Sequence, residues 1–347
     1  MVFDAESFLR QGVVLGIKPG RLLVGWGNIE WASSPFLDSE AFYIPDFFLK
    51  AEEPWLHPEY LLEISNEDLI KALGSVENPP EVSWEQPSSL FFKEQFLAVK
   101  ELISAGELKK GVPITFEKGT CPTGRLFKRY LLGQLAKQKF PLRLYGFWGE
   151  NEGIIGITPE VLFELNDKHQ IKTMALAGTR PVEDKRRTPL LEDQKELNEH
   201  YIVVDYLSHA LEELGRVHSL PTEVMTLPHL EHLLTQIDVK LRKPIEFEEI
   251  VHHIHPTPAL GTFPRNAGGD FLKDIASISD RRRFGAPFGV RFPAGDGLCL
   301  VAIRNIQWIA DKIEIGSGCG IVNESEFDRE WTEQKLKRDS VKKMLGL

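Results

Sequence analysis

The sequence predicts an α+β fold built around a mainly antiparallel sheet, and three observations support this prediction. The chain has 347 residues, 42% of them hydrophobic, which is enough to bury a large core in one large domain or two of ordinary size. After residue 90, helix-like and strand-like patterns alternate without the regular rhythm of βαβ units, which favours antiparallel pairing. Between 77 and 89, prolines and polar residues indicate a linker or a long surface loop.

The segments on either side of that stretch can be assigned in order. Short apolar runs at 22–24 and 41–45 predict strands in the first part of the chain. After the stretch, a helix ending near a C-cap at Gly106 is predicted from apolar residues at helical spacing, which are Phe92, Phe96, Val99 and Ile103.

The next segment, 110–116, alternates like a strand and contains the first candidate for catalysis. Lys110 shares its parity with the apolar residues of this segment, so its side chain should point to the apolar face. A buried lysine is costly to keep charged, and a neutral amine is a base that can activate water. The alternative is a lysine that extends to solvent along the sheet edge, with Pro113 marking that edge.

A later helix, predicted from an apolar stripe between 203 and 214, carries a carboxylate on its buried face. Extended back by one turn, the stripe reaches Glu199, which in a buried position needs a cation, a metal or a proton as partner. Lys195 lies four residues earlier and could form an ordinary helical ion pair with Glu199. The pattern leaves both interpretations open.

A glycine turn at 318–322, followed by the last helix, is the strongest indication of a binding site. The backbone N–H groups of such a turn can hold an anion. The helix is expected to start near Ser325, where Asp328 completes an approximate capping box. It places three charged residues on one face, namely Glu330, Glu333 and Lys337. Mg²⁺ takes oxygen ligands, and Glu199 with Glu333 would suit it. A solvated helix with an ordinary Glu–Lys pair is the alternative.

Other positions could contact a ligand. Gly178, Thr179 and the arginine that follows suggest carboxylate binding, with a tight turn as the alternative. Arg304 shares strand parity with apolar neighbours, so it should face the core and require a carboxylate. Glu160 begins a turn and alone says little. His255 lies in a proline-rich turn that argues against a zinc site formed with nearby histidines, and it is expected to be a single functional histidine.

The composition excludes several classes of protein. The net charge of −10 and the pI of about 5.6 argue against nucleic acid or an anionic membrane surface as partner. The cysteines Cys121, Cys299 and Cys319 are widely spaced and fit neither a disulfide framework nor a metal site, which indicates a reducing cytosol. The first six residues lack the positive start of a signal peptide, and no apolar run approaches the ~20 residues that span a membrane.

Taken together, these segments resemble, in the same order, the chorismate-utilising enzymes: isochorismate synthases, salicylate synthases, and the synthase components for anthranilate and aminodeoxychorismate. The matching segments are Gly106–Lys110, Thr158–Glu160, Ala175–Arg180, Lys195–His200, the block around His255, Ala302–Arg304 and the final glycine–glutamate block. The resemblance implies a single α+β domain over 1–347, with antiparallel sheets packed together and helices outside. Residues 1–90 match poorly and 91–347 carry the motifs.

The resemblance is strongest to the isochorismate synthases, which have a lysine at the position of Lys110 where ammonia-using branches usually have glutamine. It implies that Lys110 activates the water that attacks C2 of chorismate and that Glu160 protonates the departing C4 hydroxyl. Glu199 and Glu333 match Mg²⁺ ligands, with Glu330 close by. The positions that match substrate-binding groups are Arg304, Lys337 and the backbone near Gly318 at the enolpyruvyl carboxylate, and His255, Gly178 and Thr179 around the ring and its carboxylate.

The resemblance therefore predicts a cytoplasmic, Mg²⁺-dependent isochorismate synthase that acts as a monomer without a glutaminase subunit, in menaquinone or siderophore biosynthesis. A salicylate synthase, which goes on to eliminate pyruvate, is the alternative. An ammonia-using component is third, although Ala177 stands where aminodeoxychorismate synthases typically have lysine. Two departures from the family pattern, Leu197 for an arginine and Arg291 for a tryptophan, motivate a fourth interpretation, a non-catalytic chorismate-binding protein.

Overall fold

The computed structural model describes residues 1–76, 78–183, 188–265, 267 and 280–347. The described helices are α1 Ala5–Arg10, α2 Asn66–Leu73, α3 Ser89–Ser104, α4 Arg125–Leu135, the 3₁₀ turn η1 Leu190–Glu192, α5 Gln194–Glu212, α6 Phe247–Ile254 and α8 Phe327–Leu345. None of them combines the length and the apolar character that a bilayer crossing requires.

The strands of the first half are β1 Gly12–Lys18, β2 Arg21–Ala32, β3 Ala41–Tyr43, β4 Trp55–Ser65, β5 Ser83–Trp84, β6 Lys110–Gly111, β7 Ile114–Thr120, β8 Arg143–Trp148, β9 Glu152–Thr158 and β10 Val161–Asn166. Those of the second half are β11 Gln170–Pro181, β12 Gly215–Ser219, β13 Glu223–Thr226, β14 Leu230–Leu241, β15 Thr262–Phe263, β16 Pro287–Arg291, β17 Gly297–Val301, β18 Asn305–Ile309 and β19 Lys312–Gly318.

In the described part of the chain, the strands form one 17-stranded sheet and a two-stranded ladder of β6 with β15. Every strand pair is antiparallel, for example β1 with β8 and β11 with β14. Strands from the first 90 residues belong to the same sheet as the rest, because β1 pairs with β8 and β3 pairs with β16.

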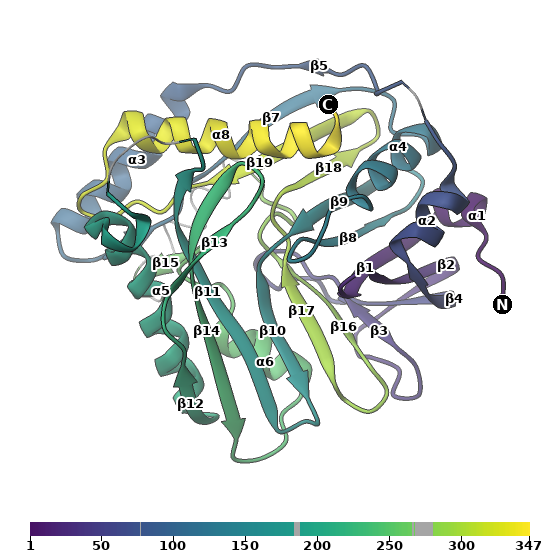
Figure 1. Ribbon diagram of the computed structural model, residues 1–347, viewed down its shortest axis with the longest axis horizontal. Helices are drawn as coiled ribbons and strands as arrows, with labels where there is room; N and C mark the ends of the chain where they lie inside the picture. The colour runs from purple at the N-terminus through teal and green to yellow at the C-terminus, as the bar shows by residue number, and fades with distance from the viewer. Residues whose placement is uncertain (77, 184–187, 266, 268–279) are drawn as a thin grey trace.

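Three apolar clusters define the layers. One consists almost entirely of strand residues from distant parts of the sheet, including Val13, Phe42, Phe147, Val290 and Leu300, so sheet packs against sheet. The other two lie under helices, one beneath α1, α2, α4 and α8 and the other beneath α5 and α6. Figure 1 shows α8 running along β19 and α5 beside β12. The predicted α+β fold, with packed antiparallel sheets and helices outside, is confirmed.

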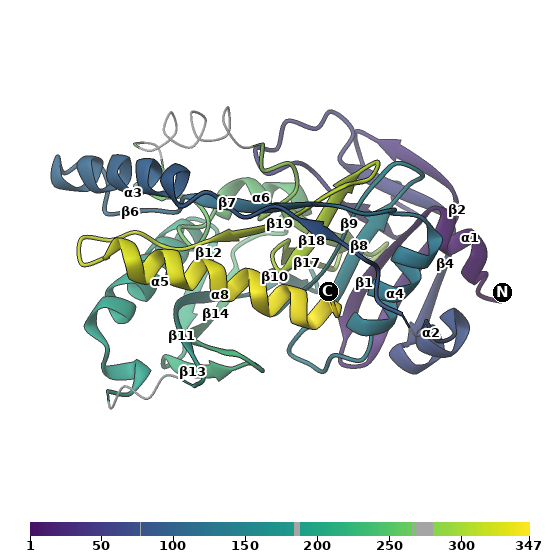
Figure 2. The same cartoon turned by 90° about the horizontal axis from the view of Figure 1, so that it is seen from above.

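The helix predicted after residue 90 is α3, and it anchors the start of α8. Its buried residues Phe92 and Phe96 pack against Phe327 and Trp331 at the beginning of α8, next to the glycine turn. Figure 2 shows α3 beside the start of α8. Burial of each such side chain contributes about 1.5–3 kcal/mol. Gly106 follows the helix with φ +76°, a conformation that favours glycine at a helix end.

Two local predictions need correction. The segment 110–116 is not one strand, because Pro113 has no N–H to donate and the chain changes partner there, from β15 for β6 to β19 for β7. The last helix begins at Phe327 and has no side-chain cap. Ser325 instead closes the glycine turn, since its hydroxyl accepts from Val322 N at 3.1 Å.

Candidate active site

A small cavity of about 90 Å³ lies between β11, α5, β14, β19 and α8. One part of its wall is apolar, formed by Leu176, Ala259, Leu260, Phe284 and Ile303. The polar side chains that line it are Glu160, Thr179, Glu199, His232, Arg304, Ser317 and Lys337, and the backbone of Gly178, Gly318 and Gly320 lines it as well. Most of the residues proposed from the sequence are therefore brought to one place from distant parts of the chain.

Glu160 occupies the tight turn between β9 and β10. Its backbone N–H donates to Thr158 Oγ1 at 3.1 Å, and its carbonyl accepts from Val301 N at 3.1 Å, so β9 and β17 fix its position. Burial raises the pKa of its carboxyl to about 7, although the positive charges of Lys110 and Arg304 act in the opposite direction. A carboxyl with this pKa can donate a proton near neutral pH.

Arg304 faces the cavity, and its partner is a histidine rather than the expected carboxylate. Its Nη2 lies 2.7 Å from His232 Nε2, and a guanidinium can only donate. The proton of His232 therefore sits on Nδ1, which is 3.1 Å from Thr179 Oγ1. Among the described residues, no carboxylate lies within ion-pair distance of Arg304, although Glu160 is close enough to affect its pKa. Arg304 can therefore offer its charge to an anion in the cavity.

The segment at 175–180 is a bulged part of β11 rather than a tight turn. The register with β14 shifts between Ala177 and Thr179, and Gly178 has φ +75°, which favours glycine. The bulge turns the Thr179 N–H toward α5, where it donates to Glu196 Oε2 at 2.9 Å. Glu196 thus connects the helix that carries Glu199 to the strand that carries Gly178.

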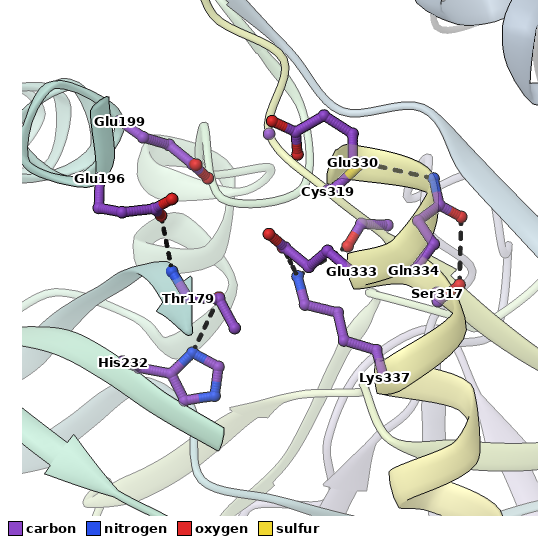
Figure 3. A network of polar contacts seen from close by, with 12 residues as sticks. Thr179, Glu196, Glu199, His232, Ser317, Cys319, Glu330, Glu333, Gln334 and Lys337 are labelled. Carbon is purple, nitrogen blue, oxygen red and sulfur yellow. Dashed lines mark hydrogen bonds and ion pairs between the residues drawn. The ribbon is translucent and has the colours of Figure 1, made fainter. Parts of the chain in front are cut away.

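Four carboxylates from two helices face one another beside the cavity. Figure 3 shows Glu196 and Glu199 on α5 and Glu330 and Glu333 on α8 pointing into the same space. The ammonium group of Lys195 lies between the two helices, 3.2 Å from Glu196, 3.5 Å from Glu199 and 3.1 Å from Glu330. The ion pair within α5 that the spacing suggested is present, and it extends to the other helix.

Lys110 is fully buried, as its strand parity predicted, and Glu199 lies between it and the cavity. Lys110 Nζ is 3.1 Å from Glu199 Oε1, and Lys110 itself does not line the cavity. Burial would raise the pKa of Glu199, but Lys110, Lys195 and Lys337 together outweigh it and lower that pKa to about 2. Glu199 is therefore ionised. The uncharged amine expected at Lys110 stays a prediction.

Lys337 connects α8 to the glycine turn. Its Nζ lies 2.7 Å from Glu333 Oε1 and donates to the carbonyl of Gly318 at 2.9 Å. The side chain lines the cavity next to Gly318, so a substrate anion would meet its ammonium group there.

The carboxylates have the chemistry that Mg²⁺ requires, although they do not converge on one point. In the described residues no three acidic, cysteine or histidine side chains are grouped as they are around a metal ion, because lysines separate them. In the described part of the chain, Glu330 Oε2 is nevertheless buried without a hydrogen bond, and Oε1 contacts the ammonium of Lys195 at 3.1 Å. Burial, together with the charges of Glu333 and Glu199, raises the pKa of Glu330. A divalent cation would neutralise this crowding of negative charge, so the donor set fits Mg²⁺.

Gly320 is the position where the backbone must approach the Lys110–Glu199 ion pair most closely. A Cβ at this residue would collide with Glu199 Oε1 and Lys110 Cε. Both side chains are buried, so they have little room to move aside.

We therefore expect Gly320→Ala to push the ion pair apart and to reduce stability by about 1–3 kcal/mol. Thermal unfolding measures this change. Gly133→Ala is the matched control, because a Cβ there meets nothing within 4 Å. An unchanged melting temperature in Gly320→Ala would show that the ion pair can relax freely.

His255 lies outside the cavity, at the end of α6. Its Nε2 donates to the carbonyl of Phe47 at 2.7 Å, and burial lowers its pKa to about 4. Ala259 and Leu260 of the same motif line the cavity instead. The two departures from the family pattern, Leu197 and Arg291, do not line it either.

Sequence reasoning missed two residues of the site. Glu196 lies three residues before Glu199 on the same helical face, the spacing that also relates Glu330 to Glu333, so the pattern could have identified it. His232 gave no such signal, because it contacts Arg304 and Thr179 only through the folding of β14 against β11.

Comparison with known proteins places the chain in a family. The profile of the family described as chorismate binding enzyme matches residues 61–346. The salicylate biosynthesis isochorismate synthase of Pseudomonas aeruginosa is 30% identical over 233 residues, 65% of this chain and 48% of that protein. Isochorismate synthase MenF of Bacillus subtilis is 33% identical over 212 residues, 58% of this chain and 45% of that protein. The chain thus spans about half the length of these relatives.

Solved structures extend the likeness over the whole chain. DhbC of Bacillus anthracis has a TM-score of 0.82 at 24% identity, covering 99% of this chain and 100% of that chain. MenF of Escherichia coli has a TM-score of 0.79 at 18% identity, covering 99% and 92%. At these identities the likeness shows the fold. Since the family profile covers most of the sequence and includes every residue that lines the cavity, the chain belongs to the chorismate binding enzyme family.

Proposed function

We propose that this protein is an isochorismate synthase that converts chorismate to isochorismate with Mg²⁺. The observation that carries the proposal is the buried carboxyl of Glu160, with a pKa near 7, in the same cavity wall as Glu199, which contacts Lys110. An acid and a base that serve one small cavity suit the loss of one hydroxyl and the addition of another. The names of the similar proteins from Pseudomonas aeruginosa and Bacillus subtilis support the same choice.

Chorismate carries two carboxylates, and the cavity offers cations and backbone groups for both. We assign the enolpyruvyl carboxylate to Arg304, Lys337 and the backbone at Gly318, which lie together in the wall. The bulge at Gly178 and Thr179 is assigned to the ring and its carboxylate. The apolar residues of the wall would pack against the faces of the ring.

The proposed reaction moves two protons. A water molecule forms the new C–O bond at C2 and gives a proton to Lys110, while the double bond shifts and the C4 hydroxyl leaves with a proton from Glu160. Water is consumed and released, so the net change is an isomerisation. Lys110 can accept a proton only as a neutral amine, so it has to give its own proton to solvent and leave its ion pair with Glu199 before the step. Afterwards Lys110 releases the new proton to solvent and Glu160 takes one up, which restores both groups.

Mg²⁺ would be held by Glu199 and Glu333, with Glu330 close by, and when bound it would neutralise the ring carboxylate and polarise the conjugated system. Glu196, Glu199, Glu330 and Glu333 all belong to α5 or α8.

A product assay tests the proposal. Purified protein with chorismate and Mg²⁺ is expected to form isochorismate, and removal of the metal with EDTA should abolish the reaction until Mg²⁺ is restored. Fluorescent salicylate as the product would assign the protein to the salicylate synthases, and turnover that requires ammonia would assign it to the ammonia-using branches. Binding of chorismate without any product would contradict an enzymatic role.

A further inference from the structure

Arg281 is a buried cation that the proposed reaction does not use. Its side chain is 0% exposed, and in the described part of the chain no carboxylate lies within ion-pair distance of it. Burial alone lowers the pKa of its guanidinium, to about 9. A buried charge is unfavourable unless hydrogen bonds or other contacts compensate for it, so its partners indicate what it does.

Two of those partners are backbone carbonyls at the end of the small β6–β15 ladder. Arg281 Nη1 donates to Leu260 O at 2.8 Å, and Nη2 donates to Val112 O at 3.0 Å. In the ladder Gly111 pairs with Thr262, so Val112 directly follows the last pair on one strand and Leu260 lies two residues before it on the other. Pro113 follows and has no N–H to continue the pairing. The two Nη groups of the guanidinium therefore hold both strands of the ladder at the point where their backbone hydrogen bonds end.

The third partner is an aromatic ring from the first part of the chain. The guanidinium lies 4.4 Å from the centre of the Phe47 ring, a cation–π distance. The carbonyl of Phe47 accepts from His255 Nε2 at 2.7 Å. His255 begins the segment that leads to Leu260, so Arg281 and His255 fix the two ends of that segment against Phe47.

Both strands of the ladder lead directly to the proposed site. Lys110 lies two residues before Val112, and Leu260 lines the cavity. Gly111 also exchanges hydrogen bonds with Ile321 of the glycine turn, N–H to carbonyl at 3.1 Å and 2.8 Å. A shift of the Val112 backbone would therefore move Lys110 relative to both the cavity wall and the turn.

We propose that Arg281 is a positioning residue that holds the backbone of Lys110 and the cavity wall at Leu260 in a fixed relation. Its role in turnover rests on the proposed function. It acts through the two carbonyls and touches no substrate. Misplacement of a reacting group by about 1 Å can reduce the rate about 10²-fold, so loosening this contact should affect kcat far more than substrate binding.

The test compares Arg281→Met and Arg281→Lys with a control from the same loop. Arg283→Met is matched, because the Arg283 guanidinium also stacks on a phenylalanine, Phe147 at 4.7 Å, and none of its described hydrogen bonds reaches Val112 or Leu260. The measurements are kcat and KM with chorismate and Mg²⁺, and amide hydrogen exchange in the peptides that contain Lys109 and Gly111.

Arg281→Met is expected to lower kcat about 10²-fold with KM changed by less than about threefold, and to speed amide exchange at Lys109 and Gly111. Arg281→Lys, which can still donate to one carbonyl, should recover part of kcat, and Arg283→Met should behave as wild type. Unchanged exchange in Arg281→Met, or faster exchange with wild-type kcat, would overturn the positioning role. A wild-type protein that does not convert chorismate contradicts the proposed function alone, because the exchange measurement does not depend on turnover.

Discussion

Lys110→Ala is expected to lower kcat for isochorismate formation by about 10²- to 10⁴-fold, the usual contribution of a general base. Chorismate affinity should change little, because Lys110 is buried behind Glu199 and does not line the cavity. The protein should still fold, since Glu199 keeps a second ammonium partner in Lys195 at 3.5 Å. Steady-state kinetics measure kcat, calorimetric titration measures the affinity for chorismate, and thermal unfolding measures stability.

Lys109→Ala provides the matched control. Lys109 is the exposed neighbour of Lys110, and its ammonium lies 5.8 Å from the ring of Phe263 at the surface. This variant should keep wild-type kinetics. If Lys110→Ala retains wild-type kcat, Lys110 is not the base; if it loses chorismate binding instead, its role is to shape the cavity through Glu199.

The sequence predicted features that depend on one element at a time. The parity of Lys110 and the helical stripe that ends at Glu199 each follow from the periodicity of a single strand or helix, and both side chains are buried as expected. The α+β class followed in the same way from the order of patterns. The burial of Lys110 was predicted correctly even though Pro113 divides the expected strand, because Lys110 lies before the break, in β6.

Contacts between elements could not be predicted in this way. Nothing in the spacing of α5 shows that Lys195 also meets Glu330, which belongs to a helix more than 100 residues later. The partner of Arg304 was expected to be a carboxylate on general grounds, yet the fold presents His232. Ser325 matched a capping pattern, but tertiary packing gives its hydroxyl to the glycine turn. In each case the local pattern fixes the type of residue, while the three-dimensional arrangement decides its partner.

The charged side chains around the cavity indicate which ligands it suits. The two helices bring four carboxylates together, and three lysines, Lys110, Lys195 and Lys337, hold them apart. Arg304 also lines the cavity and has no carboxylate within ion-pair distance in the described residues. A divalent cation beside the carboxylates and an anion beside Arg304 would each improve the local balance, and a metal-bound dicarboxylate satisfies both at once.

Glu160→Gln is expected to lower kcat by about 10²- to 10⁴-fold, because the amide keeps the shape of the side chain but cannot release a proton to the C4 hydroxyl. Stability should not fall, since a buried neutral amide resembles the protonated carboxyl that the raised pKa favours. Glu164→Gln is the control, because Glu164 lies on the adjoining strand β10, pairs with Arg143 at 2.8 Å and does not line the cavity.

The same assignment predicts how the wild-type protein responds to pH. The pKa of Glu160 in the folded protein is about 7, above its ordinary value of 4.5, so the proton it donates is present at lower pH and is lost as the pH rises through about 7. We therefore expect kcat to fall roughly tenfold for each further pH unit on the alkaline side. The stability of the folded state should also fall as the pH rises. The contribution of the Glu160 carboxyl is fully present below its unfolded pKa and is lost as the pH rises through its folded pKa. Glu160→Gln should accordingly gain in melting temperature relative to wild type as the pH rises from about 4.5 to about 7, and keep that gain at higher pH. A wild-type kcat that stays constant between about pH 6 and 9 would exclude Glu160 as the acid.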